Sequence, residues 1–84
     1  MKYCLITFRS VTPAQRAERE LRKAGYFCVI QRTPKWMENQ GCGYSLRVLH
    51  KDVKACVLTL QNAQVSYRKV YCLQENGGTE ELEI

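Results

Sequence analysis

The pattern of hydrophobic and polar positions divides the 84-residue chain into four strand-like and two helix-like segments. The strand-like segments are short and rich in aliphatic, aromatic and β-branched residues, and they cover residues 2–8, 26–30, 44–49 and 65–73. Apolar and polar side chains alternate within residues 44–49. One side of this strand should therefore be buried, namely that of Tyr44, Leu46 and Val48.

The first helix is predicted from a start signal and a stop signal. Thr12 is a suitable N-cap, Pro13 suits the first helical position, and Gln15 completes a capping box with Thr12. Gly25 provides the stop. Between these signals small and aliphatic side chains recur on one helical face, at Ala14, Ala17, Leu21 and Ala24.

The second helix is predicted from apolar residues at the spacing i, i+3, i+4, i+7. Asp52 suits its first turn and Asn62 its end. The apolar stripe consists of Val53, Cys56, Val57 and Leu60, so Cys56 is expected in the core.

The order of these elements is strand, helix, strand, strand, helix, strand. This order predicts an α+β, ferredoxin-like βαββαβ domain, with a four-stranded antiparallel sheet and two helices on one face. The domain would cover residues 1–74. Residues 75–84 are polar, acidic and glycine-containing, and we expect them to form a disordered tail.

Charge and hydropathy indicate which partners the protein could bind and where it is located. The chain has 13 basic and 8 acidic residues, and four of the acidic residues lie beyond residue 74, which leaves the preceding part near +9. Such a balance suits an acidic protein, a nucleic acid or an anionic small substrate. No apolar run approaches the roughly 20 residues of a membrane span and no signal-peptide pattern is evident, so we expect a cytoplasmic protein without a membrane partner.

The cysteines are odd in number and unevenly spaced, which favours reduced thiols over a disulfide framework. The chain has a single histidine, His50, and no Cys-x-x-Cys motif, so we predict no metal site and no cofactor. The five cysteines are Cys4, Cys28, Cys42, Cys56 and Cys72.

Cys42 differs from the other cysteines in its setting. It lies between Gly41 and Gly43, where the irregular residues 31–41 give way to a strand. Glycines bring no Cβ and let backbone amides converge, which leaves the sulfur open to a second protein. The alternative is a tight turn whose cysteine is incidental.

The predicted topology brings further residues to Cys42. Right-handed crossovers place the third strand between the first and the second, so its start shares an edge with the end of the first strand. A helix N-terminus and cations at this edge would stabilise a thiolate. His50 belongs to the opposite edge, which disfavours a Cys–His hydrolase. The residues predicted at the edge of Cys42 are Arg9, Ser10, Arg32 and Lys35.

Three stretches share a pattern with known proteins: Thr7-Phe8-Arg9-Ser10, Leu21-Arg22-Lys23-Ala24-Gly25 and Cys42-Gly43-Tyr44-Ser45-Leu46-Arg47. Together they resemble a small bacterial family of selenium/sulfur carrier-like proteins, over most of residues 3–72. The loop cysteine of that family corresponds to Cys42. The resemblance implies a carrier that holds a persulfide or perselenide on this thiol.

The leading hypothesis is therefore a carrier protein rather than a turnover enzyme. Cys42 would receive sulfur or selenium from a donor protein such as a cysteine desulfurase and pass it to an acceptor enzyme. The amides of Gly41 and Gly43 and the hydroxyls of Ser10 and Thr12 would hydrogen-bond the sulfur or its outer atom. The cations expected to stabilise the anionic charge are Arg9, Arg32, Lys35 and Arg47.

Two other classes stay open at this point, and neither uses thiol chemistry. An RNA-binding module has the same element order and a basic core, but aiming Tyr44 and Leu46 at the open sheet face would turn Arg47 toward the helices. A regulatory or structural ferredoxin-like domain would carry an inert Cys42. Thiol reactivity and salt-dependent RNA binding distinguish these classes.

The open sheet face also predicts a homodimer, because apolar side chains there would be left uncovered by the two helices. The residues expected on that face are Tyr3, Leu5, Leu49, Tyr67 and Tyr71.

Overall fold

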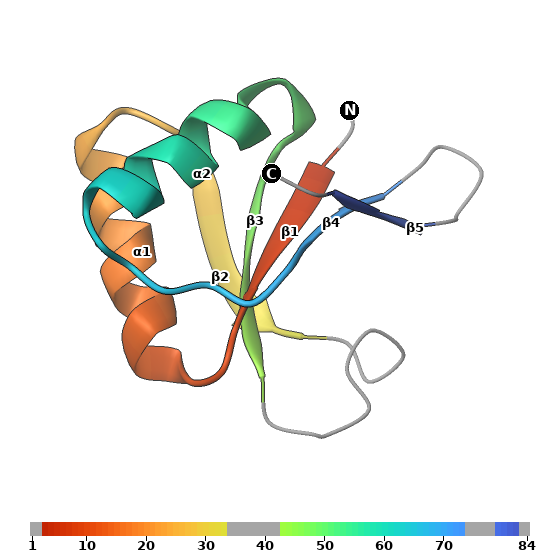
Figure 1. Cartoon of the computed structure of the whole chain (residues 1–84), viewed down its shortest axis with the longest axis horizontal. Helices are drawn as coiled ribbons and strands as arrows, with labels where there is room; N and C mark the ends of the chain where they lie inside the picture. The colour runs from red at the N-terminus through yellow and green to blue at the C-terminus, as the bar shows by residue number, and fades with distance from the viewer. Residues whose placement is uncertain (1–2, 34–42, 74–78, 83–84) are drawn as a thin grey trace.

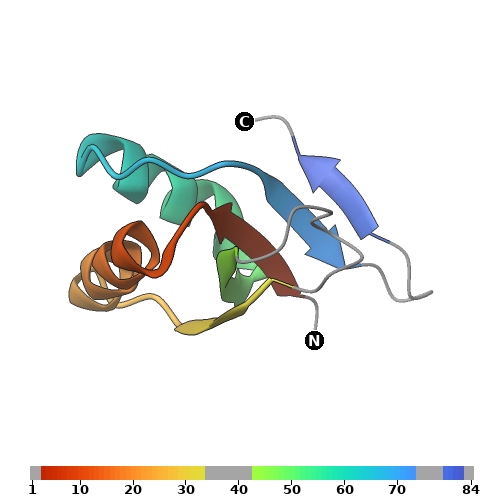
Figure 2. The same cartoon turned by 90° about the horizontal axis from the view of Figure 1, so that it is seen from below.

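The structure is a computed structural model and describes residues 3–33, 43–73 and 79–82 (Figure 1). Its strands form one antiparallel sheet in the order β2-β3-β1-β4-β5, and both helices lie on the same side of it (Figures 1 and 2). The first four strands and two helices confirm the predicted α+β, ferredoxin-like arrangement. In chain order the elements are β1 (Tyr3–Phe8), α1 (Val11–Lys23), β2 (Cys28–Arg32), β3 (Tyr44–Leu49), the 3₁₀ turn η1 (His50–Asp52), α2 (Val53–Asn62), β4 (Val70–Leu73) and β5 (Thr79–Leu82).

The core lies between the sheet and the two helices. The predicted helix faces are confirmed except at Ala24: Ala14, Ala17 and Leu21 of α1 are fully buried, and the whole apolar stripe of α2 is buried. Ala24 is the exposed C-cap of α1, beyond its last turn, and does not belong to the buried face. On the sheet, Leu46 and Val48 face the helices as predicted. The strand residues that complete this core are Cys4, Ile6, Phe8, Cys28, Val70 and Cys72.

The start of α1 differs from the prediction. The helix begins at Val11, with Ser10 as an N-cap in extended conformation, and no side chain caps it. Pro13 therefore lies in the first turn, where a missing N–H costs nothing because the first four N–H groups of a helix have no partner within the helix. The capping box of Thr12 and Gln15 is not formed.

Both helices end in a turn that delays the following strand. The Tyr26 amide donates to the Leu21 carbonyl at 2.9 Å, and the Val65 amide donates to the Leu60 carbonyl at 2.9 Å. These bonds cap the helix C-termini, so the amides of Tyr26 and Val65 are not available to a sheet. β2 begins at Cys28 rather than at residue 26, and β4 begins at Val70 rather than at residue 65. Just before Val70, the Lys69 amide donates to the Thr7 hydroxyl instead of to a strand carbonyl.

Part of the predicted tail belongs to the sheet. Thr79–Leu82 form β5, which pairs antiparallel with β4 from Leu73↔Thr79 to Val70↔Leu82. The sequence between the two strands contains Asn76-Gly77, a dipeptide typical of hairpin turns. The expectation of disorder is therefore wrong for residues 79–82. Among the described residues, no helix has the length and apolar character needed to cross a membrane.

Candidate functional site

The start of β3 lies where the topology predicted it, at the end of the sheet at which β1 and β2 also end. This end of the sheet is called the edge below. Tyr44 pairs with Phe8 at the end of β1 and with Arg32 at the end of β2. The buried Gly43 accepts a hydrogen bond on its carbonyl from the Thr33 amide at 3.0 Å. The Arg32 guanidinium carbon lies 5.8 Å from the centre of the Tyr44 ring, which holds this cation at the edge.

The N-terminus of α1 lies at the same edge, because only Arg9 and Ser10 separate it from the end of β1. The first turn of α1 contains no acidic side chain, so its partial positive charge is not offset within the helix. The Ser10 hydroxyl is not used for capping, and Thr12 is exposed in the first turn. This helix end is therefore suited to stabilise a nearby anion.

A basic pocket opens beside Arg9. It is an open hollow of about 540 Å³ that Arg9 shares with the segment leading into β4. Thr7 fixes this segment: its amide donates to the Lys69 carbonyl at 2.8 Å, its hydroxyl accepts from the Lys69 amide at 3.0 Å, and its carbonyl accepts from the Arg68 amide at 2.7 Å. The pocket is lined by Arg9, Ser66, Tyr67, Arg68 and Lys69.

Four of these pocket residues do not follow from the sequence pattern. The pattern predicts a strand over residues 65–69, whereas the structure has them outside β4. The available signal was the density of charge and hydroxyl groups in Ser66-Tyr67-Arg68-Lys69, which suits an exposed segment better than a strand between neighbours.

The structure does not bring every predicted site residue to this edge. Arg47 lies in the middle of β3, opposite Leu5, and its guanidinium carbon is 5.1 Å from the centre of the Tyr3 ring. Tyr3 pairs with Leu49, at the end of β3 that is remote from Gly43. Arg47 therefore extends away from the start of β3. The predicted residues Lys35, Gly41 and Cys42 lie outside the described residues.

His50 follows the far end of β3, as the topology predicted. The length of β3 separates it from Gly43, and six strand residues at about 3.3 Å each amount to about 20 Å. His50 is thus not a base for chemistry next to Gly43.

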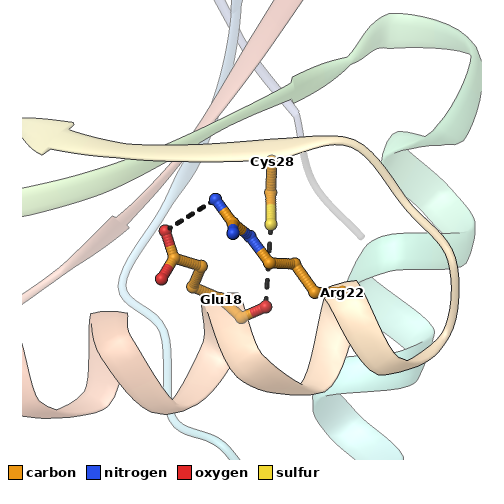
Figure 3. Close-up of polar contacts among 3 residues, drawn as sticks. All are labelled: Glu18, Arg22 and Cys28. Carbon is orange, nitrogen blue, oxygen red and sulfur yellow. Dashed lines mark hydrogen bonds and ion pairs between the residues drawn. The ribbon is translucent and has the colours of Figure 1, made fainter.

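Cys28 and Cys56 are free thiols in the core, which confirms the prediction for Cys56. The Cys28 thiol donates to the Glu18 carbonyl at 3.7 Å, and the Arg22 guanidinium lies between the Glu18 carboxylate and the Cys28 sulfur (Figure 3). Burial raises the pKa of Cys28, and the hydrogen bond and charge of Arg22 offset this only in part. Burial, with the nearby charges of Asp52 and Cys28, raises the pKa of Cys56 to about 12.

Cys4 and Cys72 form a disulfide between β1 and β4. The expectation that all thiols are reduced is therefore wrong for this pair. The two residues are 68 positions apart and are brought together by strand pairing, which their spacing in the sequence does not reveal.

Comparison with known proteins identifies a family that this sequence matches. The profile of the family described as "Putative Se/S carrier protein-like" matches residues 3–72, which is most of the chain and includes Cys42. No curated protein and no solved structure matches the sequence. The match covers all elements from β1 into β4, and with it the edge at Gly43. The chain therefore belongs to the Se/S carrier protein-like family.

Proposed function

We infer that this protein carries sulfur or selenium as a persulfide or perselenide on Cys42. The observation that supports this most directly is the state of the other cysteines. Cys4 and Cys72 are joined in a disulfide, and Cys28 and Cys56 are buried with raised pKa values. Cys42 is thus the remaining thiol for a carrier role, and it follows a glycine and precedes Gly43 at a cationic edge.

The edge has the chemistry that such a cargo requires. A persulfide or perselenide is anionic near neutral pH, so positive charge stabilises it. Arg9, Arg32 and the N-terminus of α1 all lie at the edge where β3 begins. In the proposed site Lys35 adds charge, and the amides of Gly41 and Gly43 and the hydroxyls of Ser10 and Thr12 donate to the cargo. Arg47 is left out because it extends toward Tyr3.

The transfer step is a thiol–disulfide type of exchange. The Cys42 thiolate attacks the outer sulfur of a donor persulfide, and a bond forms between the two sulfurs. The bond within the donor persulfide breaks, and its electron pair leaves with the donor thiolate. The acceptor enzyme then takes the outer atom from Cys42 by the same exchange, which regenerates the thiolate.

The basic pocket suits the partner proteins of this exchange. Arg9 belongs both to the pocket and to the edge at Gly43, so a partner bound in the pocket would lie beside the start of β3. Exposed cations at this place fit an acidic surface on a donor such as a cysteine desulfurase, or on an acceptor. The thiol must be reduced to accept cargo, so we place the carrier in the cytoplasm.

The predicted homodimer is not part of the proposed function. Leu5 is only 2% exposed, and Tyr67 packs against the core on the helix side. Among the described residues the exposed large hydrophobic side chains are Phe27 and Leu58, which do not belong to the predicted face. The apolar surface that motivated the dimer is therefore smaller than expected.

Intact-mass analysis tests the carrier function. The protein is incubated with a cysteine desulfurase and cysteine, and the wild type should gain the mass of one sulfur atom that a reductant removes. Cys42→Ser should gain nothing. Cys28→Ser, which removes a buried thiol, is the matched control and should behave as the wild type. Persulfide that forms equally on Cys42→Ser would overturn the assignment.

A further inference from the structure

A second group of sulfur and nitrogen ligands lies at the other end of the sheet. The Sγ atoms of Cys4 and Cys72 and an imidazole nitrogen of His50 all lie within 4.8 Å of one another. The three residues come from β1, β4 and η1. Both cysteines are buried, whereas His50 is exposed, so the histidine forms the solvent side of the group.

The sheet dictates this arrangement. Cys4 and Cys72 are direct partners in the antiparallel β1–β4 pair, with Cα atoms 4.0 Å apart. On its other side Cys4 pairs with Val48 of β3. Two residues after Val48 the chain leaves the sheet at η1, which brings His50 beside the cysteine pair. The cluster therefore follows from strand register rather than from a local motif.

The three side chains form a soft ligand set once the disulfide is reduced. Cysteine thiolates and a neutral imidazole are the ligands that zinc prefers, whereas Mg²⁺ and Ca²⁺ prefer oxygen. With Zn–S bonds of about 2.3 Å, two sulfurs of a tetrahedral site lie about 3.8 Å apart. The sulfurs of Cys4 and Cys72, which are bonded in the disulfide, therefore move apart after reduction to hold the ion, while His50 already lies within 4.8 Å of both. Two thiolates also neutralise the charge of Zn²⁺, which suits a site whose sulfurs are buried.

We propose that the reduced protein binds one Zn²⁺ through Cys4, His50 and Cys72, and that the Cys4–Cys72 disulfide is the metal-free, oxidised form of the same site. An external dithiol reduces the disulfide and is itself oxidised to a disulfide. Zn²⁺ then replaces the protons of the two thiols, and its fourth position is open to water or to a side chain of a partner. The reverse step uses the disulfide form of the same external dithiol: the two thiolates are oxidised to the Cys4–Cys72 disulfide, the external disulfide is reduced to the dithiol, and the ion is released.

This site is independent of the proposed carrier thiol. Cys4 and Phe8 are four residues apart on β1, which is about 13 Å along a strand, and Phe8 is the residue that pairs with Tyr44 at the edge near Gly43. A failure of zinc binding would leave sulfur transfer to Cys42 untouched, and the converse also holds.

Cobalt and zinc titrations of the reduced full-length chain test the proposal. The wild type and Cys42→Ser, which lacks the loop thiol, are reduced with a dithiol. The dithiol is then removed under anaerobic conditions, and each protein is titrated with Co²⁺. We expect one equivalent of Co²⁺ with a thiolate-to-cobalt charge-transfer band in both proteins, and full displacement of Co²⁺ by one equivalent of Zn²⁺. The oxidised protein should show no band.

Variants assign the ligands. His50→Ala leaves the disulfide and the core intact and should weaken zinc binding by at least about tenfold. Lys51→Ala, a neighbouring exposed residue of η1, is the matched control and should bind as the parent does. Cys72→Ser should lose the charge-transfer band. The proposal is overturned if the reduced chain shows no such band, if His50→Ala binds as tightly as the parent, or if only Cu⁺ binds.

Discussion

Gly25 and Gln64 hold the same position at the ends of the two helices: each is the residue after the C-cap, with φ of 89° and 58°. At both ends the amide of this residue donates to a carbonyl three residues earlier, Arg22 in α1 and Gln61 in α2. The second end therefore uses a left-handed conformation that favours glycine but contains a glutamine. This difference gives two opposite substitutions with opposite expected effects.

Gln64→Gly should raise the free energy of unfolding by up to about 1 kcal/mol. The left-handed conformation destabilises a non-glycine residue by about 1–2 kcal/mol, and glycine removes this cost. The larger backbone entropy that glycine loses on folding offsets part of the gain. Gly25→Ala should lower it by about 1 kcal/mol. A Cβ at Gly25 would meet no atom within 4 Å, so this cost comes from the backbone alone. Urea unfolding curves of both variants check the pair, and a neutral Gly25→Ala would contradict the explanation.

The periodic spacing of hydrophobic residues along the sequence was sufficient to predict most of the fold. The buried stripes of both helices and the core side of β3 follow from side-chain spacing, which depends only on local geometry. The starts of β2 and β4 did not follow, because the amides of Tyr26 and Val65 cap the preceding helices and the Lys69 amide donates to the Thr7 hydroxyl. A capping bond competes with a sheet bond for one donor, and the sequence pattern does not show which bond wins.

The sequence was sufficient to place side chains that depend on the order of the strands, but not to pair residues that depend on strand register. The meeting of Arg9, Arg32 and the start of β3 follows from the order of strands. The disulfide between Cys4 and Cys72 depends instead on the register of two strands far apart in the sequence. A shift of that register by one residue would turn one cysteine to the opposite face of the sheet.

Thr7 is expected to be a stability determinant of the basic pocket. Its hydroxyl both accepts from the Lys69 amide and donates to the Lys69 carbonyl, and the residue is 2% exposed. Thr7→Val keeps the shape but leaves the Lys69 amide without this acceptor, so the free energy of unfolding should fall by about 1–3 kcal/mol. Thr7→Ser keeps the hydroxyl and should lose less. Equal losses in the two variants, measured by urea unfolding, would show that packing rather than the hydrogen bonds matters.

Cys56 should make the protein less stable at high pH. Its pKa is about 12 in the folded protein against an ordinary value of 9.0, so between these values the unfolded chain loses a proton that the folded protein keeps. Stability from this group is complete below pH 9 and falls as pH rises toward 12, by at most about 1.4 kcal/mol per pH unit. Unfolding free energies of the wild type and Cys56→Ala across this range check the effect. Parallel curves would contradict it, because the variant lacks the titrating thiol.

Cys42 is expected to react fastest among the five cysteines, because the other four are bonded or buried. The folded protein is alkylated with a limiting amount of iodoacetamide. Peptide mass analysis should then find the label on Cys42 first. Earlier labelling of Cys28 or Cys56 would contradict the assignment of the carrier thiol.

The charge at the edge should control that reaction. Arg9→Glu reverses a cation at the end of β1, where the start of β3 pairs with it, so the thiolate of Cys42 should be less favoured and alkylation at pH 7 should slow by about two- to fivefold. Lys54→Glu makes the same change of charge on the exposed side of α2 and is the matched control. High salt should reduce the difference between Arg9→Glu and the wild type, because screening weakens an exposed charge. Equal slowing in both variants would mean that net charge acts on the reagent and that Arg9 has no local role at Cys42.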